Sequence, residues 1–218
     1  MQFKDRTHAG QILAERLAHY RRDSRVLVLA LPRGGVPVAY EVAKSLGAPL
    51  DIFLVRKLGV PGYEEFAMGA IASGGVRVMN PQAAELRIPQ DQIDAVAARE
   101  MQELERRERL YRGARLPLEV EGRIVVLVDE RLATGSTMRA AVLAVRQKNP
   151  LRLVVAVPVA APETCNEFRA QVDETVCALT PEPFRAVGLW YENFNQTSDD
   201  EVRSLLAASR EAENSRAT

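Results

Sequence analysis

Asp129 and Glu130 are adjacent acids that follow the most apolar segment of the chain, residues 124–128. A turn of small residues, Ala-Thr-Gly-Ser-Thr at 133–137, comes next and leads into a segment with helical spacing of its apolar side chains. Small side chains and one glycine let consecutive backbone N–H groups converge on an anion. A helix N-terminus adds partial positive charge, and three hydroxyls add donors. The turn therefore predicts a phosphate-binding site.

Two carboxylates beside a phosphate would repel it unless each has a partner of its own. They can accept hydrogen bonds from sugar hydroxyls, or a divalent cation can lie between them and the phosphates. The alternative is a solvated acid pair at the end of a strand, with a Ser or Thr capping the next helix. The small-residue turn in the same loop favours the ligand site.

Two further loops place chemistry at the ends of expected strands. Residues 31–36, Leu-Pro-Arg-Gly-Gly-Val, contain two glycines that allow close backbone approach to an anion, although an ordinary strand-to-helix turn would have the same composition. Residues 56–63 begin with two adjacent cations, Arg56 and Lys57, and are rich in Gly and Pro. Solvated basic side chains are the alternative for this second loop.

The spacing of apolar residues predicts alternating strands and helices. We expect strands at 25–31, 50–56, 67–72, 76–79, 123–128, 151–159 and 174–179. We expect helices at 7–20 with Thr7 as N-cap, at 36–46, 89–112, 137–148 and 163–171, and from Asp199 onward. This alternation predicts an α/β fold with a mostly parallel sheet and helices on both faces. Ligands of such sheets bind beyond the carboxyl ends of the strands.

The segment 124–138 resembles the phosphoribosyl pyrophosphate signature of the type I phosphoribosyltransferases: an apolar strand, two acids, two variable residues and the small-residue turn. The resemblance extends over nearly the whole chain and is nearest to small bacterial phosphoribosyltransferase-like proteins of unassigned acceptor. It implies that Asp129 and Glu130 hold the ribose hydroxyls, and Mg²⁺ indirectly through ribose and water. It also implies that the turn 133–137 holds the 5-phosphate.

The same resemblance assigns expected roles to the other loops. Residues 31–36 would form the pyrophosphate loop, with a cis peptide bond between Pro32 and Arg33. Residues 57–66 would form a lid whose cation closes on the pyrophosphate. A small hood, from about 1–10 and 180–198, would stack the base on Trp190 or Tyr191. A helical insertion at about 81–112 completes a single domain, 1–218.

The expected activity is transfer of phosphoribosyl from phosphoribosyl pyrophosphate to a nitrogen nucleophile, such as a nucleobase, with Mg²⁺ and release of pyrophosphate. The expected catalytic residues are Asp129, Glu130, Arg33 and Lys57. The expected substrate-binding residues are Pro32, Arg33, Gly34, Gly35, Arg56, Lys57, Asp129, Glu130, Ala133, Thr134, Gly135, Ser136, Thr137, Trp190 and Tyr191.

A second hypothesis is a regulatory protein that binds phosphoribosyl pyrophosphate or a nucleotide without turnover. Glu130 and Arg131 motivate it, because relatives often carry Asp and Gly at these positions. An unrelated phosphate-binding α/β protein is a third reading, but the chain lacks both the P-loop and the dinucleotide-binding glycine patterns after a strand.

Composition excludes several classes of function. The chain has 218 residues, with 47% hydrophobic and 27% charged, as in ordinary globular proteins. Basic and acidic residues number 29 each, so no overall positive field favours nucleic acid. No apolar run approaches the roughly 20 residues that cross a bilayer, and we expect a cytoplasmic protein without membrane contact. The 89–112 helix would suit a homodimer, and Cys165 and Cys177 are expected to be reduced thiols.

Overall fold

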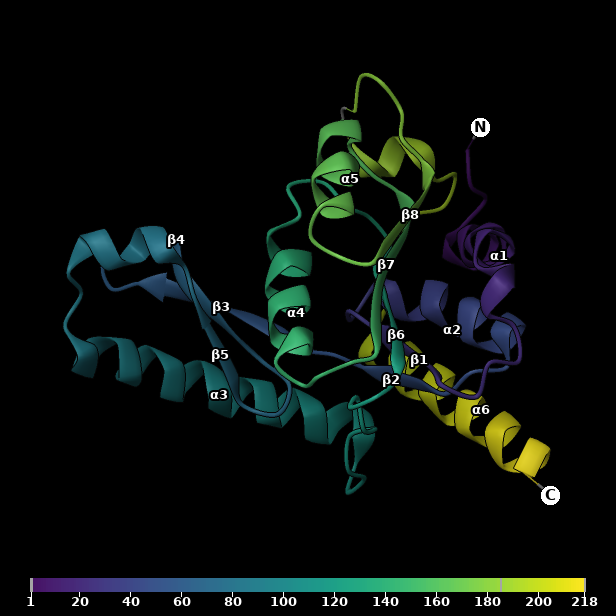
Figure 1. Ribbon diagram of the computed structural model, residues 1–218, viewed down its shortest axis with the longest axis horizontal. Helices are drawn as coiled ribbons and strands as arrows, with labels where there is room; N and C mark the ends of the chain where they lie inside the picture. Colours follow the sequence, from purple (N-terminus) through teal and green to yellow (C-terminus); the bar gives the residue numbers. More distant parts are fainter. Residues whose placement is uncertain (1, 185, 218) are drawn as a thin grey trace.

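A parallel five-stranded sheet forms the centre of the computed structural model, which describes residues 2–184 and 186–217. The strand order is β2-β1-β6-β7-β8, and every neighbouring pair is parallel. The strands are β1 (Val26–Ala30), β2 (Leu50–Ile52), β6 (Ile124–Val128), β7 (Arg152–Val159) and β8 (Glu174–Leu179). Figure 1 shows this sheet with helices on both sides. The predicted α/β class is confirmed.

The two central strands are buried at every position because helices cover both faces of the sheet. Alternate side chains of β1 enter two different hydrophobic clusters. Val28 packs in the cluster that contains residues of α1 (Arg6–Arg16) and α2 (Gly35–Leu46). Leu27 packs in the other, which contains α4 (Ser136–Arg146) and α5 (Pro162–Arg169). This burial on both sides fixes the register of the strands that carry the candidate site.

The first helix differs from its prediction at both ends. Its N-cap is Asp5, whose carboxylate accepts a 2.8 Å hydrogen bond from the backbone N–H of His8, so the prediction of Thr7 as cap is wrong. The helix ends at Arg16, and a short 3₁₀ helix, η1 (Ala18–Tyr20), replaces its last turn. The last helix, α6 (Asp199–Ala217), begins at Asp199 as expected and packs against α2.

A second, antiparallel sheet and a long helix form an arm that extends from the main sheet (Figure 1). The sheet contains β3 (Val55–Val60), β4 (Tyr63–Ala72) and β5 (Val76–Met79), and η2 (Pro81–Leu86) and α3 (Gln90–Arg112) follow. The expected strand 50–56 is therefore wrong as one element, because β2 and β3 belong to different sheets. Residues 56–63, expected as a loop, form most of β3, the turn after it and the first residue of β4. Gly59 allows the two strands to approach at a bulge, since a Cβ there would lie 2.7 Å from the Glu64 carbonyl oxygen.

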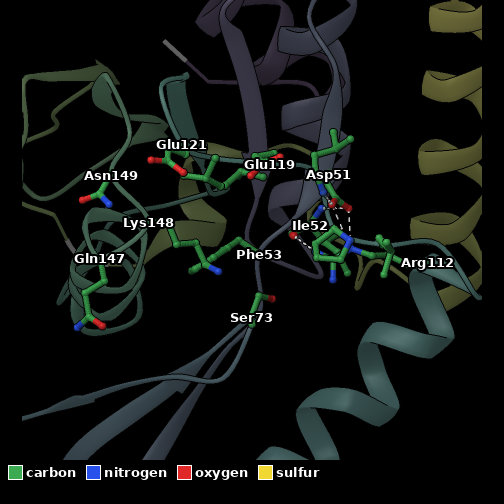
Figure 2. Close-up of a pocket in the computed structure, with 16 residues that line it drawn as sticks. Asp51, Ile52, Phe53, Ser73, Arg112, Glu119, Glu121, Gln147, Lys148 and Asn149 are labelled. Carbon is green, nitrogen blue, oxygen red and sulfur yellow. Dashed lines mark hydrogen bonds and ion pairs between the residues drawn. The ribbon is translucent and has the colours of Figure 1, made fainter.

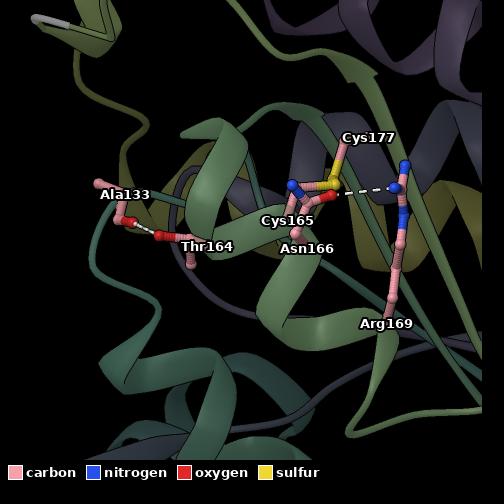
Figure 3. Close-up of a disulfide and its surroundings, with 6 residues drawn as sticks. All are labelled: Ala133, Thr164, Cys165, Asn166, Arg169 and Cys177. Atoms are coloured by element: carbon pink, nitrogen blue, oxygen red, sulfur yellow. Dashed lines mark hydrogen bonds between the residues drawn. A yellow bond between two sulfur atoms is a disulfide. The ribbon is translucent and has the colours of Figure 1, made fainter.

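The prediction of two reduced thiols is wrong in this structure, because a disulfide joins Cys165 of α5 to Cys177 of β8 (Figure 3). Their Cα atoms lie 6.6 Å apart, within the usual range for such a bond. Helix α5 contacts β8 directly, and this contact brings the two cysteines together.

Segments near the two ends of the chain pair beside the carboxyl edge of the sheet. Phe3 forms a parallel bridge with Tyr191, next to η3 (Val187–Trp190). The N–H of Phe3 donates to the Trp190 carbonyl at 2.8 Å, and the N–H of Glu192 donates to the Phe3 carbonyl at 2.8 Å. The structure thus brings together parts of both expected hood segments, whose function stays a prediction. Among the described residues, no helix has the length and apolarity required to cross a membrane.

Candidate functional site

Two strand-to-helix loops meet at the centre of the parallel sheet. The chain leaves β1 toward β2 on one side and leaves β6 toward β7 on the other, so the strand order diverges between them. Such a switch point is where open α/β sheets bind ligands. The loops start side by side, since the N–H of Leu31 donates to the Val128 carbonyl at 2.9 Å.

The first loop packs directly against the two acids of the second. A Cβ at Gly34 would lie 2.0 Å from a carboxylate oxygen of Glu130, and one at Gly35 would lie 3.0 Å from the Cα of Asp129. Only glycine fits either position without displacement of the neighbour. The Pro32–Arg33 peptide bond is cis, as the resemblance implied. The structure therefore joins residues 32–35 and the acid pair in one site.

The small-residue turn lines a cavity of about 140 Å³, together with Asp129, Arg131, Leu132 and Met138. Within residues 2–184 and 186–217, none of the five backbone amides from Ala133 to Thr137 donates a hydrogen bond to a protein group. Gly135 has a φ of 74°, a left-handed conformation that favours glycine, and Ser136 and Thr137 are exposed. A run of unpaired amides at a helix N-terminus is a suitable site for an anion.

Arg139 and helix α5, whose Thr164 faces Ala133 in Figure 3, hold the turn from behind. The Thr164 hydroxyl donates to the Ala133 carbonyl at 2.7 Å. The Arg139 guanidinium donates to the Thr134 carbonyl at 2.6 Å and pairs with Glu167. These bonds engage carbonyl groups of the turn, so its amides stay available for a ligand.

Asp129 is a partly buried carboxyl group with an altered acidity. Burial, and next the charge of Glu130, raise its pKa to about 7. One of its oxygens accepts a 2.7 Å hydrogen bond from the backbone N–H of Glu130, which opposes the rise. A carboxyl group with a pKa near neutrality, beside an anion site, is typical of functional positions.

Arg6 is a site residue that the sequence did not reveal. Its Nε donates to the Glu130 carboxylate, and both side chains are largely buried. Another guanidinium N–H donates to the Asn195 carbonyl at 2.6 Å, and the group lies 4.2 Å from the centre of the Phe194 ring. Arg6 therefore ties the acid pair to both chain-end segments. The only signal was the expected hood at residues 1–10, since no local pattern marks an arginine 124 positions from its partner.

Comparison with known proteins identifies the family. The phosphoribosyl transferase domain matches residues 62–189, more than half of the chain. This chain belongs to the phosphoribosyltransferase family. A provisionally named phosphoribosyl transferase of Mycobacterium tuberculosis is 47% identical over 205 residues, which are 94% of this chain and 46% of that protein. The chain thus spans about half the length of the curated relatives it matches.

A solved structure supports the same conclusion for the fold. A protein from Thermus thermophilus shares 46% sequence identity, covers 95% of this chain and 99% of its own, and gives a TM-score of 0.84. A bifunctional protein of Chloroflexus aurantiacus is 34% identical over 128 residues, 57% of this chain and 65% of that protein. The parallel sheet with a separate small antiparallel sheet is the fold expected of a type I phosphoribosyltransferase.

The two aromatic residues expected to stack on a base, Trp190 and Tyr191, have different environments. Tyr191 is buried, its hydroxyl donates to the Glu130 carbonyl at 2.8 Å, and its ring stacks on Phe194 with centroids 4.8 Å apart. Burial is the main cause of a raised pKa for its phenol. Trp190 is half-buried, and its indole N–H has no hydrogen-bond partner among the described residues. Base stacking by either residue stays a prediction, and Trp190 is the more accessible of the two.

Arg56 and Lys57, the two adjacent cations of the second expected loop, lie on β3 of the arm. Arg56 donates to the Glu100 carboxylate of α3 at 2.9 Å, so its charge is already paired. Lys57 lies 3.9 Å from Glu65 and is half-exposed. A groove of about 700 Å³ separates β3–β5 from α4, and Lys57, Ser136 and Thr137 all line it. The structure thus brings Lys57 to the same groove as the turn.

A separate cavity of about 540 Å³ lies between β2, the end of α3 and residues 116–121 (Figure 2). It shares no lining residue with the cavity at the turn. Its wall contains a buried ion pair, in which Nε of Arg112 lies 2.9 Å from an Asp51 oxygen. The same carboxylate accepts from the N–H of Leu118 at 3.1 Å. These contacts anchor the C-terminal end of α3 to the main sheet.

Proposed function

We propose that this protein transfers the phosphoribosyl group of phosphoribosyl pyrophosphate to a nitrogen nucleophile, most simply a nucleobase, and releases pyrophosphate. The observation that carries the proposal is the turn 133–137, which lines a cavity next to Asp129 and whose five amides have no partner among the described residues. An anion site and an acceptor of hydroxyl hydrogen bonds in one loop match the 5-phosphate and the ribose of a single ligand.

In the proposed reaction, the bond between ribose C1 and a pyrophosphate oxygen breaks, and a bond between C1 and nitrogen forms. The electron pair of the broken bond leaves with pyrophosphate, and the nucleophile releases its proton to a leaving-group oxygen or to water. Positive charge develops on the ribose ring, and the Asp129 and Glu130 carboxylates stabilise it electrostatically. Arg33 and Lys57 would balance the charge that grows on pyrophosphate.

Mg²⁺ fits this site only together with a ligand. Among the described residues, no group of three or more His, Cys, Asp and Glu side chains is placed to hold a metal ion. Asp129 offers a carboxylate, whereas Glu130 is paired with Arg6. Mg²⁺ commonly binds one or two carboxylates and substrate phosphates. Asp129 would hold it with ligand oxygens, and the ion would neutralise charge on the pyrophosphate.

The test combines turnover and binding on the same purified protein. We expect pyrophosphate release from phosphoribosyl pyrophosphate with Mg²⁺ and at least one base of a broad panel. At 100 times its dissociation constant, a ligand adds about 2.7 kcal/mol to stability, which should raise Tm by about 5–10 °C. Ser136→Glu is the variant that tests the turn. A carboxylate is tolerated at a helix N-terminus, so the fold should be kept, but it repels a phosphate dianion there. Equal thermal shifts in both proteins would reject the turn as the phosphate site.

A regulatory binding protein is the second candidate, and the Arg6–Glu130 ion pair favours it. That pair occupies one of the two acids expected to hold the ribose. This hypothesis predicts a thermal shift with phosphoribosyl pyrophosphate but no pyrophosphate release with any base of the panel. A homodimer through α3 and a cytoplasmic location stay predictions under either candidate.

A further inference from the structure

A small polar cavity lies where the loop 32–35 meets the C-terminal part of α3 and the start of α6, and these two helices contact each other. Its volume is about 110 Å³. Three of its lining residues are arginines, and the complete lining is Arg33, Arg106, Arg107, Leu110, Tyr111 and Asp199. A water molecule occupies about 30 Å³ in the liquid, so the cavity has room for a group the size of phosphate.

The charges around this cavity do not balance. The three guanidinium groups face one lining carboxylate, Asp199. Glu103, also on α3, accepts from Arg106 at 2.7 Å and from Arg107 at 2.8 Å, and does not line the cavity. Three positive charges against these two carboxylates leave an excess of one positive charge.

Arg33 has more unused donors than either of the other two arginines of the cavity. It lies 3.7 Å from Asp199, and in the described parts of the chain its guanidinium donates no hydrogen bond. Asp199 accepts its short hydrogen bond from the Tyr111 hydroxyl instead, at 2.6 Å. A guanidinium has five N–H donors in a planar fork that suits phosphate oxygens.

We propose that this cavity binds one phosphoryl group, held by Arg33 of the loop and by Arg106 and Arg107 of α3. The insertion helix would then supply a binding site of its own, in addition to the turn 133–137. The phosphoryl group has two possible sources: free inorganic phosphate, or pyrophosphate, since Arg33 belongs to the loop that packs on the acid pair. Only the pyrophosphate source rests on the proposed function.

The first experiment measures the binding of inorganic phosphate and of pyrophosphate by calorimetry. Arg107→Gln should weaken the binding of at least one of these anions tenfold or more. Arg109→Gln is the matched control, because Arg109 lies on the same helix, pairs with Glu105 at 3.7 Å and with no other acid of the described residues, and does not line the cavity. It should change the affinity less than twofold. Equal affinities in the two variants would overturn the proposal.

Both anions can also bind the turn, so each measurement is repeated with Ser136→Glu as background. The effect of Arg107→Gln should persist there, because the two sites share no residue. An effect that disappears in this background overturns the proposal. If Ser136→Glu leaves the binding of phosphoribosyl pyrophosphate unchanged while Arg107→Gln still weakens anion binding, the proposed function fails and this site remains.

Asp199→Asn gives a prediction of opposite sign. The variant removes the lining carboxylate and keeps an oxygen that can accept from Tyr111. The affinity for phosphate should rise roughly threefold or more, because repulsion of the anion is lost. A merely structural role of Asp199 predicts an unchanged or weaker affinity, and that result, in a protein with unaltered Tm, would overturn the proposal.

Competition identifies the source. If phosphate and pyrophosphate compete for this site, and Arg107→Gln also weakens product inhibition by pyrophosphate, the leaving group is the ligand. If phosphate binds with the same affinity when phosphoribosyl pyrophosphate is present, the ligand is free phosphate. Both results support the site. If Ser136→Glu abolishes the binding of both anions, they bind only at the turn, and the proposal is overturned.

Discussion

The two loops at the switch point have similar compositions and different physical constraints. In the loop after β1, the glycines are required by packing: a Cβ at Gly35 would lie 2.9 Å from the Val128 carbonyl oxygen. In the loop after β6, Gly135 is required by its left-handed φ of 74°, and the amides around it have no partner in the described chain. The first loop is shaped by its neighbour, and the second leaves donors for a ligand. The packing of Gly35 therefore does not by itself indicate a ligand, whereas the amides around Gly135 do.

Asp129 should give the largest effect, because the second loop holds a carboxyl group whose charged form is disfavoured. The folded-state pKa of about 7 exceeds the ordinary value of 3.8, so the folded protein keeps a proton that the unfolded chain has released. This contribution to stability is complete below pH 3.8 and is lost as pH rises to 7. About three pKa units at about 1.4 kcal/mol each set an upper limit of about 4 kcal/mol.

The measurement compares the free energies of urea unfolding of the protein and of Asp129→Asn between pH 4 and 8, without divalent cations. The stability of Asp129→Asn relative to the parent should increase with pH across this range. A constant difference would show that the Asp129 carboxyl group is not desolvated, and that the two loops do not differ in this respect.

Gly35→Ala tests the packing constraint on the first loop. The added Cβ meets backbone atoms, Val128 O at 2.9 Å and Asp129 Cα at 3.0 Å, so β6 or α2 must shift. We expect a loss of about 2–3 kcal/mol in the free energy of unfolding. Gly188→Ala is the control, because its nearest neighbour would lie 3.8 Å away, and it should stay within about 0.5 kcal/mol of the parent. Equal stability of the two variants would contradict the comparison.

Arg6→Gln tests how the second loop is held by the chain ends. The substitution leaves the largely buried Glu130 carboxylate without its cation. We expect the free energy of unfolding, measured by thermal unfolding, to fall by about 1–2 kcal/mol. The double variant Arg6→Gln with Glu130→Gln should lose less than the sum of the single variants, because each loss includes the same ion pair. Additive losses would mean that the pair contributes nothing to stability.

Ser136→Ala should give the smallest effect. We expect it to change the affinity for the ligand and not the stability of the fold. The Ser136 hydroxyl is exposed at the start of α4, and we expect its removal to weaken phosphate binding about two- to tenfold, the value of one hydrogen bond. Ser204→Ala, on the exposed face of α6, should leave the affinity unchanged. Identical affinities of the two variants, measured by calorimetry, would argue against a hydroxyl donor at the turn.

Most of the fold was predictable because the buried strands are continuous apolar runs in the sequence. The expected strands 25–31 and 123–128 correspond to β1 and β6, and the turn after β6 lines a cavity as its composition indicated. The chain changes sheets between Ile52 and Val55 within one predicted strand, where no local signal marks the change. The loop expected at residues 56–63 is likewise part of a β-hairpin, because Gly and Pro occur in both structures, and its role as a lid stays a prediction.

The remaining differences depend on contacts distant in sequence. The disulfide requires that α5 pack on β8, which the spacing of Cys165 and Cys177 does not reveal. The pairing of Arg6 with Glu130 requires that both chain-end segments reach the switch point. The conformation of the turn could be predicted from residue types, whereas its supporting contacts required tertiary structure.

The bridge between Phe3 and Tyr191 has a consequence for synthesis of the protein on the ribosome. The segment that places Arg6 on Glu130 emerges early, but its pairing strand exists only after Tyr191 has been translated. A nascent chain that already contains the turn 133–137 therefore lacks the contacts that fix the acid beside it. Ligand capture should begin only after Tyr191 has emerged from the ribosome, which separates folding of the sheet from acquisition of the binding site.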